Sequence, residues 1–270
     1  MNTKIISFLC AITMACTLFT VPVAASPNIA AQSAIVIDFE TGEILFEKDA
    51  HSMRPPASMT KILTAFIVYE EIAAGNLTLD TMVSISPNAA YVSANITIQG
   101  NPLALRSGAS YSVDTLLHLI MLPSSNGACV ALAEHISGSE SAFVELMNET
   151  GLSIGMYADF RNVHGAVPNY TSAYSVGILV REFIHRHPDI LRITSSSSFE
   201  FENRTPGNTN LLIQRGSQFY ENADGFKTGT TRESGFCLSS TAYRDGTRII
   251  AVIMNAPNND RRYSDSQSRF

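Results

Sequence analysis

The apolar pattern of this chain reads as strands near both ends and as helices between them, and this order restricts the folds open to it. Ala34–Phe39 and Glu43–Glu47 flank Thr41-Gly42, which is typical of a β-hairpin. The last third holds four more strand-like segments, the final two joined by a turn at Asp245-Gly246: Phe199–Phe201, Ala223–Thr228, Gly235–Tyr243 and Arg248–Met254. We therefore expect an α+β fold in which the N- and C-terminal strands share one antiparallel sheet and helices pack around it.

Five helical patterns occupy the middle of the chain. From Met59 onward, apolar residues at positions 59, 62, 63, 66 and 67 follow the spacing of one helix face. The other four begin at Val113 with Ser112 as N-cap, run from Gly127 to Ile136, pass through Phe143–Met147, and cover Ser172–His187 before Pro188. Because no linker-like change of composition divides this order, we expect residues 26–270 to form a single domain.

The first 25 residues have the pattern of a secretory signal peptide. Lys4 is followed by an uncharged apolar or small stretch to Val21, and Val23-Ala24-Ala25 supplies the small residues that signal peptidase prefers. Cleavage is expected before Ser26. An uncleaved membrane anchor is the alternative, which Pro22 and the small-residue site disfavour.

Charge and cysteine usage narrow the classes of partner and cofactor. The net charge is −6 and no long Lys/Arg run occurs, so we expect no nucleic-acid partner. Beyond the signal peptide, only Cys129 and Cys237 remain, both in apolar runs, and they are expected to be two buried thiols. His185 and His187 are two residues apart on an expected helix and point apart, so they make no zinc pair. We expect neither a metal nor a cofactor.

Three short motifs carry the chemistry: Ser58-Met59-Thr60-Lys61, Ser124-Ser125-Asn126 and Lys227-Thr228-Gly229. In the first motif, residues three apart on a helix share a face, so the amine of Lys61 can reach the hydroxyl of Ser58. A serine is a poor nucleophile unless a neighbouring base takes its proton, and lysine is such a base only when neutral. Burial and a second cation, Lys227, would both lower the pKa of Lys61.

The second motif lies between two expected helices. Ser124 would complete a hydrogen-bonded path from Lys61 to a leaving amine and act as a proton relay. Asn126 has donors and an acceptor that suit a substrate amide. A plain helix cap is the alternative for this motif, because Ser and Asn are common before helices.

The third motif ends an expected strand. Lys227 and Thr228 offer a charge and a hydroxyl suited to a terminal carboxylate. Gly229 has no side chain, so substrate backbone can lie against the strand, and Thr230 would present its backbone N–H to an oxyanion. A strand running into a turn is the alternative.

These motifs, in this order, resemble those of serine-type D-Ala-D-Ala carboxypeptidases, the low-molecular-mass penicillin-binding proteins. The resemblance covers about residues 30–265 and also includes Pro55–Lys61, Leu132–His135, Phe143–Asn148, Asn208–Leu212, Asp224–Gly229 and Ala256-Pro257. It implies a β-lactamase/transpeptidase-like fold and an acyl-enzyme on Ser58, with Lys61 as base and Ser124 as relay. Asn126, Lys227, Thr228, Gly229 and Thr230 would bind substrate.

The resemblance also implies partners and a location. The expected substrates are peptidoglycan stem peptides ending in D-Ala-D-Ala, β-lactams are expected inhibitors, and the expected location is the outer face of the bacterial cytoplasmic membrane. Gly127 stands where the family usually has Asp, and Thr230 where His or Tyr is frequent. The family pattern continues past Asp260-Arg261 into a helix, and often into a β-rich second domain with a C-terminal amphipathic anchor. Association with the membrane surface is therefore expected only if such an anchor is missing from this chain.

Two alternatives stay open beside the carboxypeptidase. A β-lactamase needs a glutamate that activates the deacylating water, and no Glu occurs between Gly155 and Thr171. A non-catalytic receptor for peptidoglycan or β-lactams would not need intact Ser58, Lys61 and Ser124.

Overall fold

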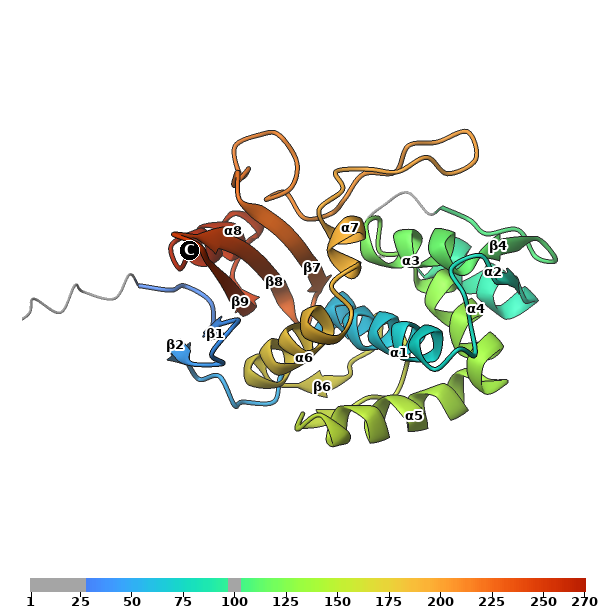
Figure 1. The fold of residues 1–270 in the computed structure, drawn as a ribbon, viewed down its shortest axis with the longest axis horizontal. Coiled ribbons are helices and arrows are strands. Elements are labelled where there is room, and N and C mark those ends of the chain that lie inside the picture. The colour runs from blue at the N-terminus through green and yellow to red at the C-terminus, as the bar shows by residue number, and fades with distance from the viewer. Residues whose placement is uncertain (1–27, 97–102) are drawn as a thin grey trace, which may run out of the picture.

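The central element is a five-stranded antiparallel sheet in the order β2-β1-β9-β8-β7. The computed structural model describes residues 28–96 and 103–270, so the predicted signal peptide, residues 1–25, lies outside the described residues. The strands are β1 Ser33–Asp38, β2 Ile44–Lys48, β7 Ala223–Thr231, β8 Gly235–Arg244 and β9 Thr247–Ala256. Because β1 pairs with β9, the sheet joins the two ends of the described chain, as expected (Figure 1).

Both expected hairpins are confirmed. β1 and β2 pair across the turn at Thr41-Gly42, where Gly42 has a φ of +76°. β8 and β9 are joined by Asp245 and Gly246, with φ values of +50° and +82°. Two positive φ angles match the tight turn whose twist suits antiparallel strands. β7 lies at the edge of the sheet, so one side of the strand that carries the third motif has no strand partner among the described residues.

All helices except α8 lie between β2 and β7 in sequence, and α8 follows β9. Five of the α-helices begin at a serine N-cap whose side chain accepts a backbone N–H: Ser86, Ser112, Ser125, Ser139 and Ser172. The helical elements are η1 Ala57–Thr60, α1 Lys61–Ala73, α2 Pro87–Asn95, α3 Val113–Met121, α4 Asn126–Ser137, α5 Glu140–Ser153, α6 Ala173–Arg186, α7 Ile190–Thr194 and α8 Asn259–Gln267. Four short strands form two small sheets: β3 Met82–Ser84 with β4 Ser110–Ser112, and β5 Ala158–Asp159 with β6 Tyr170–Thr171.

The sheet has an apolar core on each face. Ile35 and Ile37 of β1 face the larger core, which α1 and α6 cover, whereas Val36 faces a smaller core that α8 closes with Tyr263 (Figure 1). Alternate residues of a strand point to opposite faces, so one strand supplies both cores. The first nine residues of α1 are all buried, which places this helix at the centre of the molecule.

Two expectations about elements were wrong in detail. Phe199–Phe201 is no strand and forms only isolated bridges, because Phe199 packs on His118 and Phe201 on Tyr111, away from the central sheet. The helix expected from Met59 begins as the 3₁₀ turn η1, and its α-helical part starts at Lys61.

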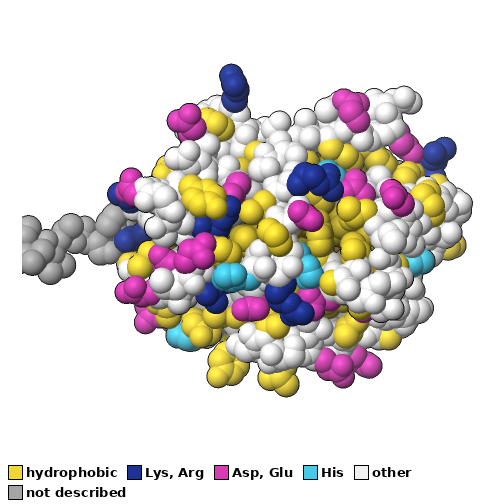
Figure 2. Space-filling model, viewed as in Figure 1, with side chains coloured by type: hydrophobic (Ala, Val, Ile, Leu, Met, Phe, Trp, Pro, Cys, Tyr) yellow, Lys and Arg dark blue, Asp and Glu magenta, His cyan; other side chains and the backbone are white. Residues whose placement is uncertain are grey.

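Cys129 and Cys237 are both buried and free, as expected. On the face shown in Figure 2, acidic and basic side chains are interspersed among exposed apolar ones. Within the described part of the chain, no helix has the length and apolar character needed to span a membrane.

Candidate active site

Ser58 and Lys61 face each other at the start of the central helix. Ser58 lies in the η1 turn, and Lys61 is the first residue of α1. The ammonium Nζ of Lys61 lies 3.0 Å from Ser58 Oγ and donates to the backbone oxygen of His164 at 2.6 Å. Side chains three apart nearly eclipse in a 3₁₀ turn, so this local geometry brings the two groups together. Ala57, just before the serine, has a φ of +50°, a strained conformation for a residue with a side chain.

Burial tunes Lys61 for proton transfer. The side chain is fully buried, and this desolvation lowers its pKa to about 8. At pH 7 about a tenth of the Lys61 side chains are therefore neutral, whereas an exposed lysine is almost entirely charged. A neutral amine in contact with a serine hydroxyl can accept its proton.

The segment from Asn162 to Asn169 holds the amine of Lys61 through the backbone oxygen of His164. The sequence did not predict this role. Gly165 has a φ of +77°, and a Cβ there would lie 1.9 Å from the backbone oxygen of Ala57. Asn162 accepts the N–H of Gly165 at 2.7 Å, and Asn169 donates to Thr60 Oγ1 at 3.1 Å. In the sequence, this segment shows only a glycine near two asparagines and a histidine. Such a pattern does not predict a contact with Lys61, about a hundred residues earlier in the chain.

In the second motif, Ser125 is the N-cap of α4. Ser125 accepts the N–H of Ala128, so neither Ser124 nor Asn126 caps α4. Ser124 has a φ of +68°, and its buried Oγ has no hydrogen-bond partner among the described residues. The path expected from Ser124 to Lys61 is therefore not closed by a direct hydrogen bond. Asn126 donates to the backbone oxygen of Ile96. Its buried Oδ1 has no hydrogen-bond partner within residues 28–96 and 103–270.

Gly127 permits two helices to pack closely. A Cβ at this position would lie 2.4 Å from both the backbone oxygen of Ala89 and the Cβ of Ser93. Since real Cβ atoms do not approach backbone oxygens so closely, α2 can lie against α4 only because this residue is glycine. The departure from the family's Asp thus has a packing reason.

The third motif lies along β7, in the strand rather than at its end. Lys227 is 1% exposed, and its Nζ donates to the backbone oxygen of Thr228 at 3.3 Å. Burial, and after it the nearby charge of Lys61, lowers the pKa of Lys227 well below its ordinary value. Thr228 donates its hydroxyl to Thr209 Oγ1 at 2.7 Å, a partner from the connection that precedes β7.

Gly229 lets β7 meet the nucleophile turn. A Cβ on Gly229 would lie 2.5 Å from the backbone oxygen of Pro56 and 3.2 Å from the backbone nitrogen of Ser58. The missing side chain therefore makes room for the protein's own turn, a reason that the sequence analysis did not consider. Arg262 of α8 donates to Thr230 Oγ1 at 2.9 Å and to the backbone oxygen of Gly229 at 3.4 Å. Sequence reasoning missed Arg262 as well.

The three motifs converge on one place. The third motif touches the first through Gly229, and Lys227 is close enough to Lys61 for their charges to interact. Cys129, one turn after Asn126 on α4, interacts electrostatically with both lysines. Burial raises the pKa of its thiol to about 12, so Cys129 is neutral and no nucleophile. The arrangement joins a serine, a buried amine and a strand that carries a second buried lysine, parts suited to acyl transfer to serine.

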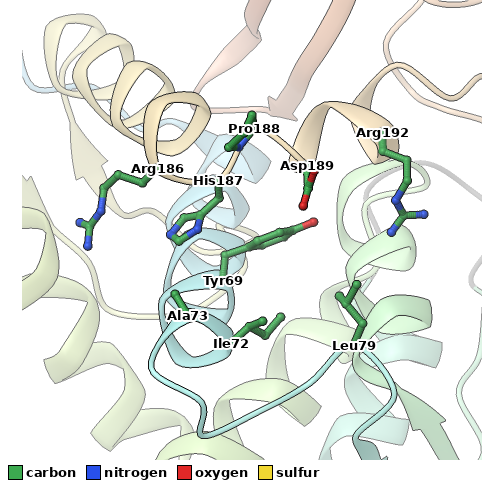
Figure 3. Close-up of a pocket in the computed structure, with 9 residues that line it drawn as sticks. All are labelled: Tyr69, Ile72, Ala73, Leu79, Arg186, His187, Pro188, Asp189 and Arg192. Carbon is green, nitrogen blue, oxygen red and sulfur yellow. The ribbon is translucent and has the colours of Figure 1, made fainter.

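A separate cavity lies at the other end of α1 and holds none of the motif residues. Its volume is about 470 Å³, and its walls come from the C-terminal part of α1, from Leu79 and from the α6–α7 junction (Figure 3). Tyr69 lies beside His187 with its hydroxyl pointing toward Asp189, and burial raises the pKa of this hydroxyl to about 12. An α-helix rises about 1.5 Å per residue, so this cavity is more than about 10 Å from Ser58.

Comparisons with known proteins agree with this geometry. The D-alanyl-D-alanine carboxypeptidase DacD of Escherichia coli (strain K12) is 34% identical over 233 residues, which are 85% of this chain and 59% of that protein. The chain thus spans about three fifths of the length of this curated relative.

Two solved structures share the fold. A peptidoglycan synthesis regulatory factor (PBP3) from Streptococcus pneumoniae matches with a TM-score of 0.84 and 34% identity, over 89% of this chain and 72% of that one. Penicillin-binding protein D2 from Listeria monocytogenes, in an ampicillin-bound form, matches with a TM-score of 0.76 and 25% identity, over 90% of this chain and 96% of that one. The expected β-lactamase/transpeptidase-like fold is thereby confirmed.

The family model described as D-alanyl-D-alanine carboxypeptidase matches residues 20–258, nearly the whole chain. This match confirms the resemblance inferred from the motifs. The chain belongs to the D-alanyl-D-alanine carboxypeptidase family, peptidase S11.

Proposed function

We propose that this protein is a serine D,D-carboxypeptidase that removes the terminal D-Ala from peptidoglycan stem peptides. The proposed catalytic residues are Ser58, Lys61 and Ser124. Asn126, Lys227, Thr228, Gly229 and Thr230 are the proposed substrate-binding residues. The observation that carries the proposal is the 3.0 Å contact between Ser58 Oγ and a fully buried lysine amine.

Acylation would begin with Lys61. Its neutral amine takes the proton of Ser58 as Oγ attacks the carbonyl carbon of the penultimate D-Ala. The developing oxyanion is stabilised by the backbone N–H groups of Ser58 and Thr230, which lie across the contact between β7 and η1. The proton then passes to the leaving amine through Ser124, whose unpartnered hydroxyl is available for that contact. Water hydrolyses the ester and releases the shortened peptide.

Binding of the substrate's terminal carboxylate would decide which of the two lysines, Lys61 or Lys227, carries the positive charge. Two buried ammonium groups close together disfavour each other, and burial together with the charge of Lys61 lowers the pKa of Lys227. A carboxylate at Lys227 favours the charged form of that residue. A charged Lys227 in turn favours a neutral Lys61, so substrate binding itself would activate the base.

The two alternatives receive less support. A β-lactamase-like hydrolase needs a glutamate that activates the deacylating water, and no Glu occurs between Gly155 and Thr171, where the resemblance would place it. A non-catalytic receptor would need no neutral base, yet the pKa of Lys61 is lowered to about 8.

Partners and location are part of the same proposal. The ampicillin-bound form of the Listeria relative supports β-lactams as covalent inhibitors of this chain. The predicted signal peptide supports an extracytoplasmic location at the outer face of the membrane.

The proposal is tested by mass spectrometry and product analysis. Penicillin should add one stable adduct, located on Ser58 by peptide mapping and absent from Ser58→Ala. A peptide ending in D-Ala-D-Ala should release one D-Ala per molecule. Rapid turnover of penicillin without an adduct would favour the β-lactamase, and an adduct without D-Ala release would favour the receptor.

A further inference from the structure

A cavity of about 550 Å³ borders the proposed active site on one side. It is lined by Leu103, Pro123, Arg204, Thr205, Pro206, Gly207 and Thr209. Two of these residues adjoin the motifs directly. Pro123 precedes Ser124 in the chain, and Thr209 accepts the hydroxyl of Thr228 at 2.7 Å.

The positions of Pro123 and Thr209 indicate on which side of the scissile bond the cavity lies. In the proposed function, on which this inference rests, Ser124 delivers a proton to the leaving amine and Thr228 helps to bind the leaving group's carboxylate. Both groups therefore act on the part of the substrate beyond the scissile bond. The cavity continues from that part, and its volume far exceeds what the methyl side chain of D-Ala occupies.

Arg204 gives the cavity its chemical preference. It is the single charged residue in the lining, and within the described residues its guanidinium has no hydrogen bond or ion pair. Of the acidic residues that precede Arg204 in this segment, Glu202 accepts from Arg106 at 3.2 Å and from the hydroxyl of Tyr111 at 2.9 Å, and Glu200 accepts from Thr205 Oγ1 at 3.4 Å. An unpaired guanidinium beside a binding site is suited to a carboxylate, which it can bind with two parallel hydrogen bonds.

The wall that carries Arg204 is anchored to the rest of the site. Asn208 donates to the backbone oxygens of Thr194 and Ser196, both at 3.0 Å. The N–H of Thr209 bonds to the backbone oxygen of Leu122 at 3.0 Å, which ties this wall to the segment that carries Ser124. The cavity therefore keeps a defined position relative to the second and third motifs.

We propose that this cavity is a subsite for leaving groups and acyl acceptors larger than D-Ala, namely D-amino acids or peptides with a second carboxylate, which Arg204 binds. A site that binds a leaving amine also binds an attacking amine, because the two steps are the reverse of each other. In the acceptor reaction, the amine nitrogen attacks the acyl-enzyme carbonyl and a C–N bond forms. The ester bond to Ser58 breaks, and the amine proton returns through Ser124 and Lys61 to Ser58 Oγ. The acyl group is thereby transferred to the amine instead of to water.

The test separates acceptor binding from acylation. A peptidyl-D-Ala thioester acylates Ser58 with a thiol as leaving group, and the acyl-enzyme then partitions between water and an added D-amino acid. The acceptors form matched acid and amide pairs, D-aspartate with D-asparagine and D-glutamate with D-glutamine. D-2-aminoadipate, whose side chain is one methylene longer than that of D-glutamate, tests a longer distance to Arg204. The ratio of aminolysis to hydrolysis products is measured for each acceptor.

Wild-type enzyme should capture at least one of the acids about tenfold better than its amide, in line with a charge-assisted hydrogen bond. Arg204→Ala should bring that ratio close to one. Arg215→Ala is the matched control, because this exposed arginine lies in the same connection before β7 but outside the cavity, and it should leave the ratio unchanged.

An acid-to-amide ratio near one in the wild type, or one that Arg204→Ala leaves unaltered, would overturn the subsite while leaving the proposed function intact. If the thioester does not acylate Ser58, the proposed function fails and the subsite fails with it. The two failures are therefore distinguishable.

Discussion

At the scale of single residues, Lys61 sets the pH dependence of acylation. The neutral amine is the active form, and burial lowers its pKa to about 8, so acylation should fall as the pH drops through that value. Below it, kcat/KM for penicillin or peptide should fall about tenfold per pH unit. Lys61→Arg should lose at least about 100-fold at every pH, because a guanidinium does not deprotonate in proteins. Stopped-flow acylation rates measure both effects.

Lys48→Arg is the control for that substitution. Lys48 donates to the backbone oxygens of Ile29 and Ala31 at 2.8 Å, away from the motifs, and an arginine can make similar contacts. An enzyme with Lys61→Arg that acylates at close to the wild-type rate would rule out the role of Lys61 as base.

Lys227 governs the preference for a free carboxylate. A charge-assisted hydrogen bond contributes about 1.5–3 kcal/mol, or roughly one to two powers of ten in kcat/KM. Lys227→Ala should therefore weaken hydrolysis of a free D-Ala-D-Ala peptide more than hydrolysis of its C-terminal amide. The measured quantity is the acid-to-amide ratio of kcat/KM in both enzymes. A ratio that is the same in wild type and variant would mean that Lys227 does not bind the carboxylate.

At the scale of elements, the contact between β7 and η1 depends on Gly229. A Cβ there would lie 2.5 Å from the backbone oxygen of Pro56, so strand and turn must separate to accommodate it. Gly229→Ala should destabilise the protein by about 1–3 kcal/mol and slow acylation of Ser58. Thermal unfolding and penicillin labelling measure the two effects.

Gly216→Ala serves as the control, since a Cβ at Gly216 would meet no atom within 4 Å. It should change neither the melting temperature nor the labelling rate appreciably. If Gly229→Ala behaved like Gly216→Ala, the close packing of β7 on η1 would not matter for the position of the nucleophile.

At the scale of the whole molecule, α8 brings Arg262 behind the third motif. The guanidinium donates to Thr230 Oγ1 at 2.9 Å and to the backbone oxygens of Gly229 and Cys237, each at 3.4 Å. Arg262→Met leaves these acceptors without their donor, which should cost about 1–3 kcal/mol of stability. It should also raise the pKa of Lys227, because the charge of Arg262 contributes to lowering it.

Arg261→Met is the matched control, because Arg261 is exposed on the same helix. Thermal unfolding gives the stability difference, and the pH dependence of the acid-to-amide ratio reports on Lys227. If Arg262→Met unfolds at the wild-type temperature and keeps the wild-type pH profile, α8 does not support the third motif.

The sequence by itself determined the features that depend on neighbours along the chain. Thr41-Gly42 and Asp245-Gly246 mark hairpins because the residues at those turns accept a positive φ. Ser112 marks a helix start because its side chain accepts a backbone N–H three residues later. Ser58 and Lys61 meet for the same reason, since three residues of helical turn separate them. All of these interactions are local, so the pattern of residues is enough to predict them.

Only the tertiary structure decided the features that join distant segments. His164 holds the amine of Lys61 from 103 residues away, and Arg262 supports Gly229 from 33 residues away. Phe199 alternates like a strand residue, yet it packs on His118 and joins no sheet. The pKa of Lys61 is lowered because the fold excludes water around it, and no local pattern records that exclusion. Burial and long-range contacts arise from the packing of the whole chain, so they cannot be read from sequence spacing.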